Sequence, residues 1–330
     1  MNRFRAEIAE QPEAARRLLA SGPERAAAIA TRIRHAGTHG FTIAARGSSD
    51  HAALYAKYLF GVRNRSLVAL AAPSLFTHYA RPPRLEGQCV IGISQSGQSP
   101  DVIAVIEEAR RQGAPTVAIT NVEGSTLAKT AELVLPLQAG EEVSVPASKT
   151  YTTSLIAMAL ISQALDPDSQ FAHALARVPD AITLALHRAR EVDALVPALN
   201  GPRAVVLGRG YNFSTAEEVA LKLSETSYVL ARAWSVADFE HGPIAIAEAG
   251  LPVIIIDGGG NVAGDLGSIE EKLKAKGLQV MRLTDDSGLP EELTPIPLAV
   301  LGQLLAHDVA IARGFDPDRP RTIQKVTRTW

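Results

Sequence analysis

The sequence has few of the residues on which several classes of protein depend. Cysteine occurs once, at Cys89, so no intrachain disulfide framework can form, and a lone cysteine before an apolar strand is expected to be buried and inert. A formal net charge of -2 gives no electrostatic reason to expect a nucleic acid or an anionic membrane surface as partner. No signal-like N-terminal stretch or apolar run of ~18 residues stands out, so we expect a cytoplasmic protein.

The composition is otherwise that of an ordinary globular protein. The chain has 330 residues, of which 46% are hydrophobic and 21% charged, enough for two domains with separate cores. Gly22-Pro23 is expected to interrupt the helices at the N-terminus. We expect four parts: a helical arm over 1–36, a first domain over 37–165, a helical connection over 166–199 and a second domain over 200–330.

Short apolar runs alternate with helical stretches along both halves of the chain. The expected strands are 41–45, 67–71, 89–93, 116–120 and 133–137 in the first half, and a run from 204, 253–257 and 279–284 in the second. Alternation of this kind indicates βαβ units and a parallel sheet covered by helices on both faces.

The second half of the chain repeats the first. The segment FTIAARGSSDHAALYAKYLF matches AVVLGRGYNFSTAEEVALKL, and Arg46-Gly47 corresponds to Arg209-Gly210. The predicted fold class is therefore α/β, with two tandem units that are each a doubly wound, flavodoxin-like parallel sheet. Ligands of such sheets lie at the carboxyl ends of the strands.

The stretch VIGISQSGQSPD, residues 90–101, is the most distinctive candidate binding loop. An apolar strand ends in hydroxyl and amide side chains around Gly97, just before an amphipathic helix, so backbone N–H groups and the helix dipole favour an anion there. The loop has no lysine and no GxxxxGK[ST] pattern, which favours a small phosphorylated metabolite over a nucleoside triphosphate. A serine-rich turn that only caps the helix remains the alternative.

Charged residues elsewhere have two interpretations each. Glu218, Lys222 and Glu225 share a helix face, which is either a solvated ion-paired surface or a set of proton carriers. His241 lies in a polar turn, where a histidine is as often structural as functional. Lys325, near the C-terminus, is by default a solvated side chain.

Five motifs taken together resemble the sugar isomerase (SIS) family, most closely the isomerase region of glutamine:fructose-6-phosphate amidotransferase. They are SQSGQSPD, ASKTYTT, GRG with EEVALKLSETSY, EHGP and DRPRTIQKV. The resemblance implies two tandem SIS domains and assigns the substrate phosphate to Ser49, Ser94, Gln95, Ser96 and Ser99, and the sugar to Val145 and Ala147. The family has a serine at the position of Ala147.

The same resemblance implies the catalytic roles. Glu225, with Lys222 on the same helix, would shuttle the proton between C1 and C2, and Lys325 would form a Schiff base with the open-chain ketose. His241 would open the sugar ring from the neighbouring subunit, so a homodimer is expected. The resemblance implies no metal and no other cofactor.

Asn2 narrows the expected activity. The amidotransferase has a glutaminase domain with a cysteine directly after its initiator methionine, and Asn2 stands at that place here. We therefore expect a glucosamine-6-phosphate deaminase that forms fructose 6-phosphate and ammonia. The alternatives are a deglycase of fructosamine phosphates, another phosphosugar aldose-ketose isomerase, and, with less support, a sugar-phosphate sensor.

Overall fold

The computed structural model describes residues 2–325, which form two compact units that are treated separately below. The first-sheet unit consists of Glu13–Glu142, Lys149–Ala176, Gln324 and Lys325. The second-sheet unit consists of 2–12, Val143–Ser148 and Arg177–Ile323. Each unit therefore contains one sheet and is completed by a segment from a distant part of the chain.

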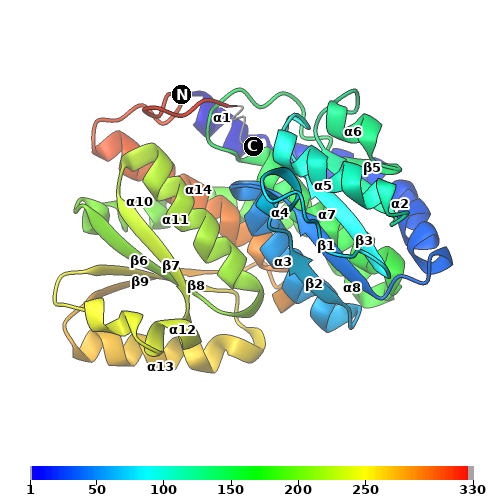
Figure 1. Ribbon diagram of the computed structural model, residues 1–330. Coiled ribbons are helices and arrows are strands. Elements are labelled where there is room, and N and C mark those ends of the chain that lie inside the picture. Colours follow the sequence, from blue (N-terminus) through cyan, green and yellow to red (C-terminus); the bar gives the residue numbers. More distant parts are fainter. Residues whose placement is uncertain (1, 326–330) are drawn as a thin grey trace. The chain divides into compact units, whose positions relative to one another are not determined.

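The first-sheet unit contains a five-stranded parallel sheet in the order β2-β1-β3-β4-β5, the flavodoxin-like order (Figure 1). Its strands are β1 (Gly40–Ala44), β2 (Leu67–Leu70), β3 (Gln88–Ile93), β4 (Thr116–Thr120) and β5 (Leu133–Pro136). Every strand predicted for the first half is found within one residue at each end. The central strands β1, β3 and β4 are buried almost throughout, as the apolar runs indicate.

The helices of this unit cover both faces of the sheet. They are α2 (Gln11–His35, which starts in the other unit), α3 (Ser48–Arg63), α4 (Ser74–Thr77), α5 (Pro100–Arg111), α6 (Thr126–Thr130), α7 (Lys149–Leu165) and α8 (Ser169–Ala176). The predicted break at Gly22-Pro23 is wrong, because α2 continues through it. A Cβ on Gly22 would lie 2.6 Å from Leu160 Cδ1, so this glycine permits close packing against α7.

The second-sheet unit contains a four-stranded parallel sheet in the order β7-β6-β8-β9. Its strands are β6 (Arg203–Gly208), β7 (Leu230–Ser235), β8 (Pro252–Asp257) and β9 (Gln279–Thr284). The order repeats that of the first four strands in the other unit, which confirms the internal repeat and the α/β fold class. Sequence analysis missed β7, an edge strand with an exposed Leu230.

The second-sheet unit contains short 3-10 helices in addition to its α-helices. The α-helices are α1 (Arg3–Ala9), α9 (Val178–His187), α10 (Ala189–Asp193), α11 (Phe213–Ser227), α12 (Val236–Glu240), α13 (Ala263–Ala275) and α14 (Pro295–Ala312). Short 3-10 helices are η1 (Val196–Leu199), η2 (Gly210–Asn212), η3 (Pro243–Ile246), η4 (Gly260–Val262) and η5 (Glu291–Leu293). Side chains of α12 and α13 pack on one face of the sheet, where they form an apolar core with β6 and β8.

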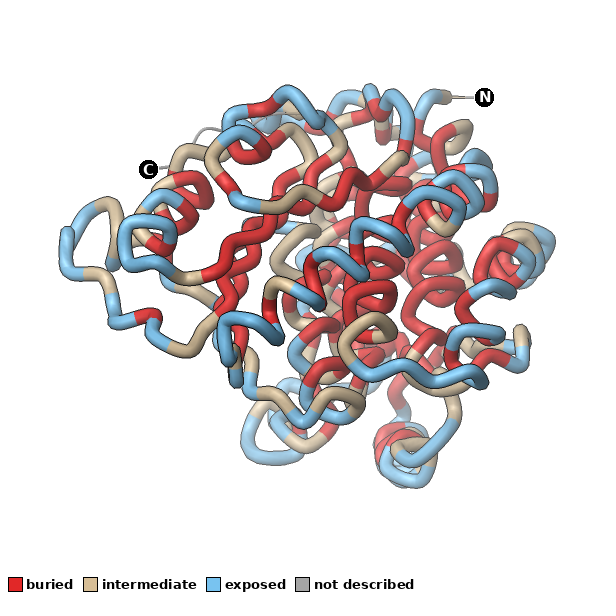
Figure 2. The backbone as a smooth tube through the Cα atoms, turned by 90° about the vertical axis from the view of Figure 1, so that its right-hand side faces the viewer, coloured by how far each residue is buried: buried red, intermediate tan, exposed pale blue. Residues whose placement is uncertain are grey.

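Helix α14 is the main buried helix of the second-sheet unit. It packs along α11 so closely that a Cβ on Gly302 would lie 2.2 Å from Val219 Cγ2. Among residues 2–325 it is the one helix long and apolar enough to cross a membrane, and 83% of it is buried inside the fold. Buried residues are drawn red in Figure 2.

Candidate functional site

The two loops that carry the predicted phosphate ligands follow β1 and β3 of the first-sheet unit. These strands are neighbours in the sheet (Figure 1). Ala44 pairs with Gly92 at their carboxyl ends. In the order β2-β1-β3-β4-β5 the chain reverses direction across the sheet between β1 and β3, and this switch point is where doubly wound sheets bind ligands. The N-termini of α3 and α5 begin at the same edge.

The loop between β3 and α5 is held in a compact shape by its own serines. The hydroxyls of Ser94 and Ser99 lie 3.1 Å apart, and the Gly97 N–H donates to Ser94 Oγ at 3.2 Å. The backbone oxygen of Gln95 accepts from the Asn121 N–H at 3.1 Å, which ties the loop to the end of β4. The Gln98 N–H donates to Ser96 Oγ at 3.3 Å. Hydroxyl groups therefore converge at the N-terminus of a 12-residue helix, an arrangement suited to an anion.

Gly97 is required by this loop for two reasons. Its φ of +62° is in the left-handed region, which side chains with a Cβ rarely adopt. A Cβ there would also lie 2.1 Å from Ser125 Oγ. The glycine thus allows the loop to lie directly against the start of α6.

The second loop places Ser49 in the first turn of α3, after Gly47 with a φ of +55°. Beside it, Arg46 donates from Nε to Asp101 Oδ2 at 2.6 Å, and Asp101 is fully buried in the first turn of α5. The Arg46 side chain is about half exposed (51%). Sequence analysis did not single out Arg46. Through its contact with Asp101, this residue brings a cation to the start of α5, next to the serine loop, which has no lysine.

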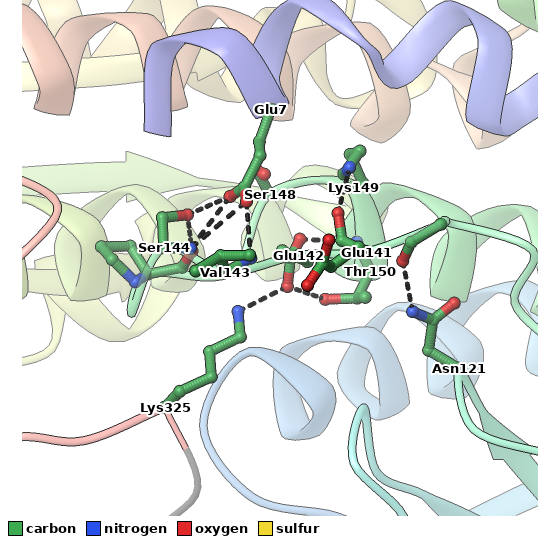
Figure 3. Close-up of polar contacts among 12 residues, drawn as sticks. Glu7, Asn121, Glu141, Glu142, Val143, Ser144, Ser148, Lys149, Thr150 and Lys325 are labelled. Atoms are coloured by element: carbon green, nitrogen blue, oxygen red, sulfur yellow. Dashed lines mark hydrogen bonds and ion pairs between the residues drawn. The ribbon is translucent and has the colours of Figure 1, made fainter. Parts of the chain in front are cut away.

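Lys325 lies in the first-sheet unit and is paired with a buried carboxylate. Its Nζ is 2.7 Å from Oε2 of Glu142, whose side chain has no exposed surface (Figure 3). Glu142 also accepts from the Thr150 N–H at 3.1 Å and from Thr150 Oγ1 at 2.7 Å. The default interpretation of Lys325 as a solvated side chain is wrong. Glu142 was missed, and only its place in the polar stretch before α7 could have indicated it.

Val145 and Ala147 lie in the short segment Val143–Ser148, which belongs to the second-sheet unit. Both are partly exposed. Glu7 on α1 fixes the start of this segment, because its Oε1 accepts from the Val143 N–H at 2.6 Å and its carboxylate also accepts from the Ser144 hydroxyl (Figure 3). Sequence analysis missed Glu7, which no local pattern relates to a segment so distant in the chain.

The charged residues of α11 are buried in the second-sheet unit. Lys222 Nζ lies 2.6 Å from Glu225 Oε2 and 3.4 Å from Glu218 Oε1, and the side chains of Lys222 and Glu218 are each only 1% exposed. The solvated-surface interpretation is therefore wrong for these two residues. Burial lowers the pKa of Lys222, but the two carboxylates outweigh it and leave the pKa above its ordinary value. Glu225 remains 23% exposed and is the accessible member of the group.

His241 lies at the exposed turn that ends α12 in the same unit. Gly242 follows with a φ of +143°, which lets the chain reverse into η3. The imidazole is therefore presented at the surface of the unit rather than used as part of its core.

The loop after β8 corresponds to the serine loop of the first half but is closed by the chain itself. The Asn261 N–H donates to Glu291 Oε2 at 2.7 Å, and Asn261 Nδ2 lies 3.2 Å from the same oxygen. The Glu291 carboxylate thus already accepts the hydrogen bond from the backbone N–H of Asn261 after this strand. The two halves share a topology and differ in what their loops can bind.

Cys89 is buried in β3, and burial raises its pKa to about 12. The expectation of an inert thiol is confirmed. Among residues 2–325, no group of three or more His, Cys, Asp or Glu side chains is arranged to hold a metal ion.

Two doubly wound parallel sheets, one of them with a serine-lined loop at its switch point, define a class of α/β protein suited to binding a small anion. The chain matches the SIS domain over residues 39–163 and 200–290 and belongs to this family. A candidate phosphosugar isomerase from Silicibacter pomeroyi has a similar crystal structure: 32% identity, a TM-score of 0.88, and coverage of 96% of this chain and 100% of that one.

A curated relative extends the comparison to the amidotransferases. The glutamine--fructose-6-phosphate aminotransferase [isomerizing] of Thermococcus kodakarensis is 34% identical over 342 aligned residues, which cover 97% of this chain and 56% of that protein. The chain thus spans about half the length of this relative. The glucosamine-6-phosphate deaminase of Thermotoga maritima shares the fold, with a TM-score of 0.81 at 20% identity over 99% of this chain and 100% of that one.

Proposed function

We propose that this protein is an aminosugar-phosphate deaminase/isomerase that converts glucosamine 6-phosphate to fructose 6-phosphate and ammonia. The contact between Lys325 and the buried Glu142 carries the proposal. The buried carboxylate holds the lysine amine in a fixed position and within proton-transfer distance, which binding of a sugar phosphate alone does not require. An enzyme that forms an imine needs such an amine.

In this proposal the phosphate group is bound by Ser49, Ser94, Gln95, Ser96 and Ser99. The compact loop and the α5 N-terminus support that assignment, since they provide hydroxyl donors and a favourable dipole. Phosphate binding supplies energy that positions the reacting carbons, and Val145 and Ala147 border the sugar.

Proton transfer between C1 and C2 is assigned to Glu225. Its partial exposure and its 2.6 Å contact with Lys222 support the assignment, because the carboxylate is oriented by a buried cation and still reachable. Lys325 forms the imine with the open-chain sugar, and His241 opens the ring. The exposed position of His241 suits donation to a neighbouring subunit of a homodimer.

The test is a coupled assay on purified protein. Glucosamine 6-phosphate is expected to give equal amounts of ammonia and fructose 6-phosphate, and Glu225→Gln is expected to reduce turnover by at least ~100-fold, the usual contribution of general acid-base catalysis. Glu271→Gln, an exposed change on α13, is the control and should retain full activity.

Two outcomes would point to the other candidates. Release of a free amino acid from a fructosamine phosphate, without ammonia from glucosamine 6-phosphate, would identify a deglycase. Saturable sugar-phosphate binding without any turnover would identify a sensor and overturn the proposal.

A further inference from the structure

Glu142 is a carboxylate that the residue assignments above leave without a role. It lies between β5 and α7, and its side chain is completely buried. Oε2 of Glu142 lies 2.7 Å from both Lys325 Nζ and Thr150 Oγ1, while Oε1 accepts from the Thr150 N–H at 3.1 Å. Figure 3 shows the Lys325 side chain extending toward this carboxylate.

The carboxylate has other stabilising partners besides the lysine. Thr150 lies in the first turn of α7, so its N–H group and the helix dipole both favour a negative charge at Glu142. Lys325 differs from these partners because its side chain is 22% exposed, whereas that of Glu142 has no exposed surface. The Lys325 side chain thus keeps some exposed surface while its Nζ contacts a fully buried carboxylate.

The chemistry of imine formation needs such a partner. An ammonium group has no lone pair, so Lys325 must lose a proton before it can attack carbon. A base within about 2.6–3.2 Å of the proton it removes is in hydrogen-bond reach. Glu142 meets this distance at 2.7 Å, and its burial keeps bulk water from the transfer.

We propose that Glu142 is a further catalytic residue, the base and acid that serves Lys325; this inference rests on the proposed function. Glu142 takes a proton from the Lys325 ammonium, and the neutral Nζ attacks C2 of the protonated ketimine formed from the aminosugar. The new bond is Nζ–C2, and the bond that breaks joins C2 to the substrate nitrogen.

Protons and charges balance over the whole cycle, and water is the one additional reactant. The substrate nitrogen leaves as ammonia, takes the proton held by Glu142, and departs as ammonium. Water then hydrolyses the Lys325 imine, which returns the lysine ammonium and releases the ketose. Glu142 ends the cycle as a carboxylate, in the state in which it began.

The alternative role for Glu142 is to anchor the C-terminal segment through an ion pair. An anchor and a base predict different results for Glu142→Gln, because the amide retains the size of the side chain and can still accept from Thr150 but cannot take a proton. The matched control is Glu141→Gln, at an exposed neighbour whose backbone oxygen, not its side chain, binds Lys149.

The experiment traps the imine between Lys325 and fructose 6-phosphate with borohydride and follows the adduct by intact mass. We expect wild type and Glu141→Gln to trap at the same rate, and Glu142→Gln to trap at least ~100-fold more slowly at pH 7, the size of a general-base effect. The Glu142→Gln rate should recover as the pH rises, because solvent then removes the lysine proton. Binding of inorganic phosphate, measured by calorimetry, should be unchanged.

Equal trapping rates and equal pH profiles for Glu142→Gln and wild type would overturn the inference while leaving the proposed function intact. No adduct with wild type would overturn both. If Glu142→Gln does not fold, Glu142→Asp replaces it. Its shorter side chain should slow trapping, but by less than the ~100-fold expected when the base is removed, and a wild-type rate would overturn the inference.

Discussion

The Lys222 ammonium lies 2.6 Å from the Glu225 carboxylate on α11, with almost no exposed surface of its own. Glu218 approaches the same nitrogen at 3.4 Å from the preceding turn of the helix. Two carboxylates therefore share one buried cation, and only Glu225 is partly open to solvent. This arrangement has consequences for both stability and catalysis.

Lys222→Met should be strongly destabilising. The change leaves Glu218 buried without its cation, and breaking a buried ion pair in this way costs about 3–5 kcal/mol. The matched control is Lys272→Met, which removes an exposed ion pair with Glu240 and should cost less than about 1 kcal/mol. Urea unfolding followed by circular dichroism measures both, and equal losses would contradict the buried pairing.

Alkaline pH should remove the contribution of Lys222 to stability. Because the pKa of Lys222 is raised in the folded protein, the unfolded chain loses this proton first as the pH rises. The contribution is then complete below about pH 10.4, the ordinary pKa of lysine, and falls at higher pH. The difference in unfolding free energy between wild type and Lys222→Met should be constant from neutral pH to that point and shrink above it. A constant difference at higher pH would contradict this assignment.

Gly97→Ala should weaken phosphate binding. The backbone of Gly97 is left-handed, and the added Cβ would lie 2.1 Å from Ser125 Oγ, so the loop must move. A strain of about 1–2 kcal/mol corresponds to an affinity loss of roughly tenfold, which the stabilisation of the protein by inorganic phosphate in thermal unfolding would report. Gly124→Ala is the control, since no atom lies within 4 Å of its added Cβ. Equal stabilisation of the two variants by phosphate would be the contrary result.

Mixing two inactive variants should restore activity if His241 acts in a neighbouring subunit. In a hybrid of His241→Ala with Glu225→Gln, one of the two sites would contain both an intact His241 and an intact Glu225. Random exchange between symmetric dimers predicts about a quarter of the wild-type activity. The measurement is the ammonia assay after co-refolding, with light scattering to establish the dimer. An inactive mixture that is dimeric would place His241 in the site of its own chain.

The fold was predictable because its signals are local. The strands of the first half were placed within a residue, since each is a short apolar run bounded by polar turns. Strand β7 was missed for a local reason as well. It follows a helix that ends at Tyr228 with a φ of +55°, a position where glycine is the usual signal.

The binding loop was also visible in the sequence. A strand, a glycine among hydroxyl residues and a helix follow one another within 12 residues, so sequence alone determines that backbone donors and hydroxyls meet at Ser94 and Ser99. Arg46 was not predictable in the same way. Its partner Asp101 belongs to another strand–helix unit, and only the pairing of β1 with β3 brings the two side chains together.

Sequence by itself therefore determined the repeated α/β architecture and the loop after β3, because hydrophobic periodicity and turn chemistry act over a few residues. Tertiary structure decided which charges are buried and which are paired. Lys222 and Glu218 are buried because α14 packs along α11. Lys325 reaches Glu142 across 183 residues of chain, and no local pattern encodes a contact that forms only when distant segments pack together.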